Sequence, residues 1–126
     1  MIVEIVLELR DTDFYDGRLE WSLPVLPRVG EVFRPELLVR AFDVKKVYDH
    51  LSPANQDIWD GYKPSYEGTN FTQEELERSC FVRYLMDCGW LVLEEVQWGY
   101  SNKLGSYPLL TIRERENLYE PSYMKD

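Results

Sequence analysis

The chain has 126 residues and a mass of 15.0 kDa, which is the size of one domain. Its residues are 44% hydrophobic and 14% aromatic, with a mean hydropathy of -0.42, so the composition excludes a disordered chain and a membrane-spanning chain. The 23 acidic against 14 basic residues give a net charge of -9, which disfavours binding to nucleic acid and to anionic lipid. The same charge suits a basic protein partner, although it also serves solubility.

The chain begins with two predicted strands. Apolar and polar residues alternate over 2–9, which indicates a half-buried strand, and the alternation returns over 18–23. Asp16-Gly17 lies between them and tolerates the positive φ of a tight turn, so we expect an N-terminal hairpin. Two prolines then interrupt the pattern, and a short strand is predicted over 29–33.

A helix is predicted over 35–50, because apolar residues there recur at steps of three and four. Pro35 suits its first turn. A strand remains the alternative for part of this segment. Residues 42–48 resemble residues 91–97, since apolar residues flank a charged pair in both, and the second copy is itself predicted to be a strand.

The segment 52–70 is predicted to be a loop with one short helical turn, with Ser52 as the N-cap and Pro53 at the first helical position. The next helix is the clearest in the sequence. Thr72 and Glu75 form a capping-box pattern, an apolar stripe follows, and Gly89 is the expected stop.

Residues 90–98 and 107–113 are predicted to pair as antiparallel strands, joined by a polar loop over 99–106. We therefore expect one α+β domain over 1–113, followed by a flexible C-terminal tail over 114–126. Its sheet is expected to be mainly antiparallel and able to curl into a small β-barrel. The N- and C-terminal hairpins build this sheet, and the middle of the chain supplies about two helices.

Catalytic, metal and cofactor motifs are missing from the sequence. His50 is the single histidine, and no phosphate-binding or nucleophile-elbow pattern occurs. Glu94 and Glu95 are adjacent on a predicted strand, so their carboxylates point to opposite faces and cannot share a substrate without a bulge. Cys80 and Cys88 are expected to be free thiols, because eight helical residues separate their Cα atoms by about 12 Å. We predict no cofactor, no metal and no catalytic residue.

The N-terminal residues have no basic segment and carry two glutamates within the apolar stretch, which is unlike a secretory signal. Together with the free thiols this predicts a cytoplasmic protein.

The predicted partner-binding residues lie in the segment 52–70. Three aromatic residues there, Trp59, Tyr62 and Tyr66, follow no helix or strand period and stand close to Asp57 and Asp60. Large rings with a polar atom on a long loop are typical of protein interfaces. The alternative is that the rings fold back and cover the sheet.

The leading functional hypothesis is a non-enzymatic protein-interaction module. Its sharper form is an acidic inhibitor or immunity-type protein that blocks a basic toxin or nuclease. The rival is a small-ligand binder or enzyme with a pocket of carboxylates and tyrosines, and a third possibility is a structural subunit of an assembly. An enclosed acidic pocket favours the rival, whereas a filled interior favours the interaction module.

Overall fold

The computed structural model describes residues 1–9 and 13–115, with the backbone alone for residues 13–16. These residues form five strands, four α-helices and two 3-10 helices. The strands are β1 (Ile2–Glu8), β2 (Asp13–Glu20), β3 (Val32–Phe33), β4 (Trp90–Ser101) and β5 (Gly105–Arg115). The helices are α1 (Pro35–Leu38), η1 (Val39–Ala41), α2 (Val44–His50), α3 (Pro53–Asp60), η2 (Lys63–Tyr66) and α4 (Gln73–Cys88), where η marks a 3-10 helix.

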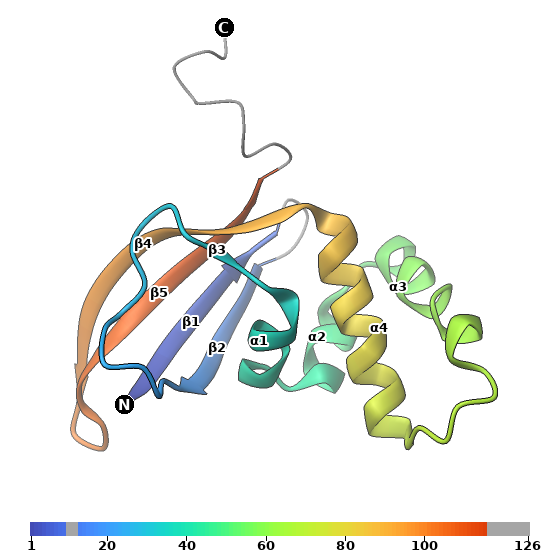
Figure 1. Ribbon diagram of the computed structural model, residues 1–126, viewed down its shortest axis with the longest axis horizontal. Coiled ribbons are helices and arrows are strands. Elements are labelled where there is room, and N and C mark those ends of the chain that lie inside the picture. Colours follow the sequence, from blue (N-terminus) through green and yellow to red (C-terminus); the bar gives the residue numbers. More distant parts are fainter. Residues whose placement is uncertain (10–12, 116–126) are drawn as a thin grey trace, which may run out of the picture.

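The strands form one sheet in the order β2-β1-β5-β4-β3. Figure 1 shows that this sheet curls into a half-barrel, with the helices gathered at one side of it. The α+β class is confirmed. The prediction of a mainly antiparallel sheet is wrong, because β1 and β5 run parallel from Glu4 beside Leu109 to Glu8 beside Arg113. Alternation along a strand specifies which face is buried, but it does not specify the neighbouring strand.

The predicted N-terminal hairpin forms, but its turn is misplaced. Gly17 pairs with Ile5 inside β2, so Asp16-Gly17 is part of the strand. Position 17 requires a glycine because the ring of Phe42 lies against its backbone. A Cβ atom on Gly17 would lie 2.6 Å from the ring of Phe42. The strand predicted over 29–33 is also shorter than expected, since β3 contains only Val32 and Phe33.

The single helix predicted over 35–50 is wrong, and so is its strand alternative. Helix α1 continues into η1, and Phe42 then takes an extended backbone with φ -120° and ψ 149°. Asp43 begins a new helix, α2, because its side chain accepts hydrogen bonds from the backbone N–H groups of Lys45 and Lys46. This cap divides one amphipathic stripe between separate helices.

Both predicted helix starts after residue 50 are confirmed. Ser52 caps α3, which extends to Asp60, so the predicted loop is largely helical and the helices number four rather than two in the described residues. Thr72 and Glu75 form the complete capping box of α4. Gly89 ends that helix with φ 116°, a conformation that favours glycine.

The C-terminal strands pair as predicted, but they are longer. The ladder runs from Trp90 beside Arg115 to Ser101 beside Gly105, with a bulge between Leu93 and Glu95. Strand β5 therefore includes residues 114 and 115 of the predicted tail. The rest of that prediction, residues 116–126, lies outside the described residues.

The core lies between the concave face of the sheet and the helices. Its fully buried side chains come from three strands, β1, β4 and β5, and from three helices, α1, α3 and α4. Val3, Ile5, Leu7, Leu38, Trp59, Phe81, Leu85, Leu93, Leu110 and Ile112 are all essentially inaccessible. The half-barrel is thus filled by side chains. Among the described helices, none combines the length and the apolar composition that crossing a membrane requires.

Candidate functional site

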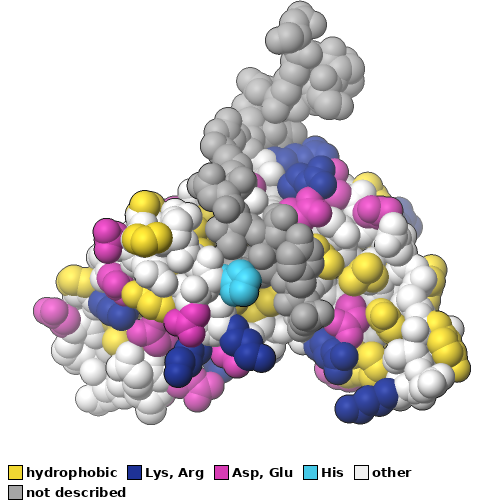
Figure 2. All heavy atoms as spheres, turned by 180° about the vertical axis from the view of Figure 1, so that it is seen from behind, with side chains coloured by type: hydrophobic (Ala, Val, Ile, Leu, Met, Phe, Trp, Pro, Cys, Tyr) yellow, Lys and Arg dark blue, Asp and Glu magenta, His cyan; other side chains and the backbone are white. Residues whose placement is uncertain are grey.

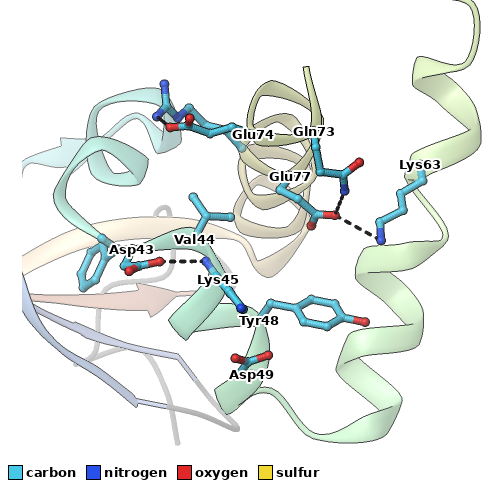
Figure 3. Close-up of a pocket in the computed structure, with 11 residues that line it drawn as sticks. Asp43, Val44, Lys45, Tyr48, Asp49, Lys63, Gln73, Glu74 and Glu77 are labelled. Atoms are coloured by element: carbon cyan, nitrogen blue, oxygen red, sulfur yellow. Dashed lines mark hydrogen bonds and ion pairs between the residues drawn. The ribbon is translucent and has the colours of Figure 1, made fainter. Parts of the chain in front are cut away.

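A cleft of about 850 Å³ opens between α2 and α4, with Lys63 of η2 at one end (Figure 3). Helix α2 and the residues just before it form one wall, and the first turns of α4 form the other. The lining residues are Phe42, Asp43, Val44, Lys45, Tyr48, Asp49, Lys63, Gln73, Glu74, Glu77 and Arg78. Its charged side chains are mixed in sign, with carboxylates slightly in excess.

The local sequence fixes both walls. Asp43 caps α2, and the Thr72 capping box starts α4, so each helix begins beside the cleft. Side chains four residues apart share one face of a helix, and two such pairs stiffen the α4 wall. The guanidinium of Arg78 lies 3.0 Å from Glu74, and the Gln73 amide donates to Glu77 over 3.0 Å.

A hydrogen-bonded network joins four helical elements beside the cleft. The Lys63 ammonium on η2 lies 3.0 Å from Asp60 Oδ1 and 3.2 Å from Glu77 Oε1. The Tyr48 hydroxyl on α2 donates to Asp60 Oδ2 over 2.9 Å, and the Trp59 indole N–H donates to Glu77 Oε2 over 2.9 Å. This network therefore ties α2, α3 and η2 to α4.

The network moves the pKa values of Tyr48, Asp60 and Lys63 away from neutral pH. The hydrogen bond to the Asp60 carboxylate raises the pKa of Tyr48 above 10.0. Burial alone would raise the pKa of Asp60, but hydrogen bonds from Lys63 and Tyr48 outweigh it and hold that pKa below 3.8. Burial alone would lower the pKa of Lys63, but Asp60 and Glu77 together raise it above 10.5.

Trp59, one of the predicted binding residues, is 0% exposed. Its ring stacks on Phe81 with the centroids 5.3 Å apart and contacts the edge of Tyr48 at 5.5 Å. Trp59 is therefore part of the core, and only its indole N–H reaches the network.

The other predicted residues divide between the surface and α4. Tyr62 is half-buried and donates to the Asp87 carboxylate of α4, and burial together with this bond raises the pKa of Tyr62. Tyr66 is half-buried beside Phe71, with the ring centroids 5.8 Å apart. Asp57 is exposed on α3, while Asp60 belongs to the network. The segment thus covers α4 rather than the sheet.

Sequence reasoning missed Tyr48, Lys63 and Glu77. In the sequence, Tyr48 lies within the helix predicted over 35–50, Lys63 within the loop predicted over 52–70, and Glu77 near the start of the capping-box helix. These predictions rest on neighbours close in sequence. The hydrogen bonds that unite these residues span 12 residues for Tyr48 to Asp60 and 18 residues for Trp59 to Glu77. The remaining local signal was the polar atom of Tyr48 within an apolar stripe.

Elsewhere the surface charge is mixed. Figure 2 shows acidic and basic side chains interspersed around His50 on the face opposite to Figure 1. On the convex side of the sheet, charged side chains pair across strands, as in Arg18 with Glu4 at 2.7 Å and Arg113 with Glu8. In the described ranges no group of three or more His, Cys, Asp or Glu side chains is placed to hold a metal ion.

Comparison with protein-family models, with curated proteins and with solved structures gives no significant match to this chain.

Proposed function

We propose that this protein is a cytoplasmic, non-enzymatic interaction module that binds a basic protein partner, and that the cleft between α2 and α4 receives basic side chains of that partner. The support is charge complementarity. The chain carries a net charge of -9, and carboxylates on both walls of the cleft, including Asp49 and Glu74, can accept hydrogen bonds from lysine or arginine. The same charge argues against nucleic acid as the partner.

The observation that carries a binding role over a catalytic role is the paired network beside the cleft. General acid and base groups work best when their pKa lies near the operating pH. Here the pKa of Asp60 is lowered, and the pKa values of Tyr48 and Lys63 are raised. At neutral pH Asp60 and Lys63 therefore stay charged and Tyr48 stays neutral, as suits a rigid recognition surface.

A small ligand with a cationic group is the second candidate occupant of the cleft. A volume of about 850 Å³ falls in the range of small-molecule sites, and a tyrosine with several carboxylates suits a cation. The mass of the native protein, recovered gently from its source, separates the two candidates. An additional polypeptide supports the interaction module, whereas an added mass of a few hundred daltons supports the small ligand.

Charge reversal tests the cleft once a co-purified polypeptide is in hand. Asp49→Lys changes an exposed residue that lines the cleft, and Asp57→Lys makes the same change on exposed α3 outside it. We expect Asp49→Lys to weaken binding by at least about tenfold while Asp57→Lys has little effect. An equal loss of affinity in both variants would mean that the partner is attracted only by the net charge. A loss of affinity in Asp57→Lys alone would place the binding surface on α3.

A further inference from the structure

The outer edge of β4 is only partly covered by β3. Strand β3 pairs with Leu91 and Val92, and the backbone just before it exchanges two hydrogen bonds with Leu93: Gly30 N–H donates to Leu93 C=O over 2.8 Å, and Leu93 N–H donates to Glu31 C=O over 2.9 Å. Strand β4 then continues to Ser101. Within the described residues, no strand pairs with this continuing edge beyond the bulge.

The register shows which backbone groups face this edge. Trp98 lies opposite Pro108 of β5, and proline has no N–H to donate. Trp98 therefore occupies a non-hydrogen-bonded position of the β4–β5 ladder, so its own N–H and C=O point away from β5. Val96 and Tyr100, two residues before and after Trp98, also occupy non-hydrogen-bonded positions, so their N–H and C=O groups point away from β5 as well. The edge thus offers three N–H and three C=O groups to an added strand.

The side chains of these residues share one face, because residues two apart in a strand point the same way. Val96 packs partly against the core, but Trp98 is 64% exposed and Tyr100 is 72% exposed. Figure 1 shows why: the ends of β4 and β5 project beyond the helices. An open edge flanked by two large exposed rings is a feature that proteins usually protect from solvent and from other strands.

Charge identifies the occupant of this edge. Exposed carboxylates lie where this edge begins, with Glu31 beside Leu93 and Glu95 just before Val96. The Glu95 side chain points to the face opposite to the two rings, where it accepts a hydrogen bond from the neutral Gln97 amide. A second copy of the chain would bring another net charge of -9 to the edge. A basic strand would instead place lysine or arginine over Trp98 and Tyr100, where cation–π attraction adds to the backbone hydrogen bonds.

We propose that the edge of β4 from Val96 to Tyr100 binds an extended basic segment of a partner protein, which adds to the sheet as a further strand. The proposal shares with the proposed function only the basic character of the partner. Its site is separate from the cleft. The added strand hydrogen-bonds to Val96, Trp98 and Tyr100, and its basic side chains at alternate positions stack on the two rings.

The test uses the full chain and a displayed library of ten-residue peptides with lysine or arginine at alternate positions and random residues between them. Peptides enriched on the wild-type protein are then synthesised and titrated by calorimetry. Tyr100→Pro and Tyr100→Thr form a matched pair, since both remove the ring but only proline removes the outward N–H. Trp98→Pro and Trp98→Thr are a second pair in case the first proline variant does not fold.

We expect the proline variant to bind an enriched peptide about tenfold more weakly than the matching threonine variant. Hydrogen exchange should slow at the amides of Val96, Trp98 and Tyr100 when the peptide binds. Equal affinities within both pairs, or no enriched peptide, overturn the proposal. Protection at α2 and α4 instead would overturn it while supporting the cleft. A wild-type dimer that the proline variant abolishes would assign the edge to a second copy.

Discussion

Trp59 shows how one residue can join the core to the candidate site. Its ring is buried against Phe81 and Tyr84, while its indole N–H satisfies one carboxylate oxygen of Glu77. The other oxygen of Glu77 accepts from Gln73 and contacts Lys63. The packing of the core therefore sets the position of a carboxylate on the wall of the cleft.

Replacing Trp59 should affect stability before it affects binding. We expect Trp59→Ala to lower the free energy of unfolding by about 3–5 kcal/mol, because it leaves a large cavity. Trp59→Phe keeps most of the apolar contact, and we expect it to cost about 1–3 kcal/mol because Glu77 loses a buried donor. Urea unfolding followed by circular dichroism measures both. Trp98→Ala, at an exposed tryptophan, is the control and should stay within about 0.5 kcal/mol of wild type.

Asp60 gives the site a predictable dependence on pH. Its pKa is lower in the folded protein than the ordinary 3.8, so the folded state releases its proton more readily than the unfolded state. The resulting stabilisation is fully present above pH 3.8 and is lost as the pH falls through the lower folded-state pKa.

The wild type loses this stabilisation only in acid, whereas Asp60→Asn should lack it at every pH. We expect the difference in unfolding free energy between wild type and Asp60→Asn to be constant near neutral pH and to shrink below about pH 4. Tyr48→Phe removes one hydrogen bond to the carboxylate and so raises the folded-state pKa of Asp60, which makes the loss in acid smaller and complete at a higher pH than in the wild type. Urea midpoints measured from pH 6 to pH 2.5 test this. A difference that does not change with pH would contradict it.

At the scale of elements, the break between η1 and α2 connects the cleft to the sheet. Phe42 lies in that break, its ring covers Gly17 of β2, and the same residue lines the cleft. The backbone on either side is held by η1 and by the Asp43 cap. A side chain on Gly17 would therefore have to displace the ring rather than the chain.

Gly17→Ala should destabilise the protein by about 1–3 kcal/mol, because its Cβ atom would stand 2.6 Å from two ring atoms of Phe42. In the background of Phe42→Ala the same substitution should cost much less, since the obstructing ring is gone. The coupling energy of the double-mutant cycle, from urea unfolding, is expected to be about 0.5–3 kcal/mol. Additive costs would mean that Gly17 is required for a reason other than this contact.

The elements that sequence reasoning predicted correctly carry their signals within a few residues. The alternation in β1, the Thr72 capping box and Gly89 are local features, and the structure confirms each. The division of 35–50 into separate helices depended on whether one aspartate at position 43 would act as a cap. Because an apolar stripe continues through that position, periodicity alone favoured one helix.

Local patterns in the sequence could not predict how the elements are arranged in the whole molecule. Strands β1 and β5 come from opposite ends of the chain, and their parallel pairing joins the two predicted hairpins into one curled sheet. The cleft likewise depends on how α2, η2 and α4 meet. Of the predicted site residues, Trp59 and Asp60 do converge there, whereas Tyr62 and Tyr66 contact other parts of α4 and its flanks.

The distribution of charge over the whole molecule leads to a prediction about kinetics. Carboxylates lie at the cleft and beside the edge of β4, and the net charge of -9 extends an attractive field toward any basic partner. Such a field accelerates encounter, and salt screens it over a Debye length of about 10 Å at 0.1 M. An acidic inhibitor of a basic toxin or nuclease would depend on this effect most strongly.

We therefore expect the association rate constant for the basic partner to fall by at least about tenfold between roughly 0.05 M and 0.5 M salt, while the dissociation rate changes much less. Surface plasmon resonance with the co-purified polypeptide, or with an enriched basic peptide, measures both rates. Neutral sucrose at matched viscosity controls for slower diffusion. If association does not respond to salt, apolar contact with Trp98 and Tyr100 dominates the encounter and the inhibitor hypothesis fails, because a surface selected to capture a basic enzyme rapidly would depend on long-range attraction.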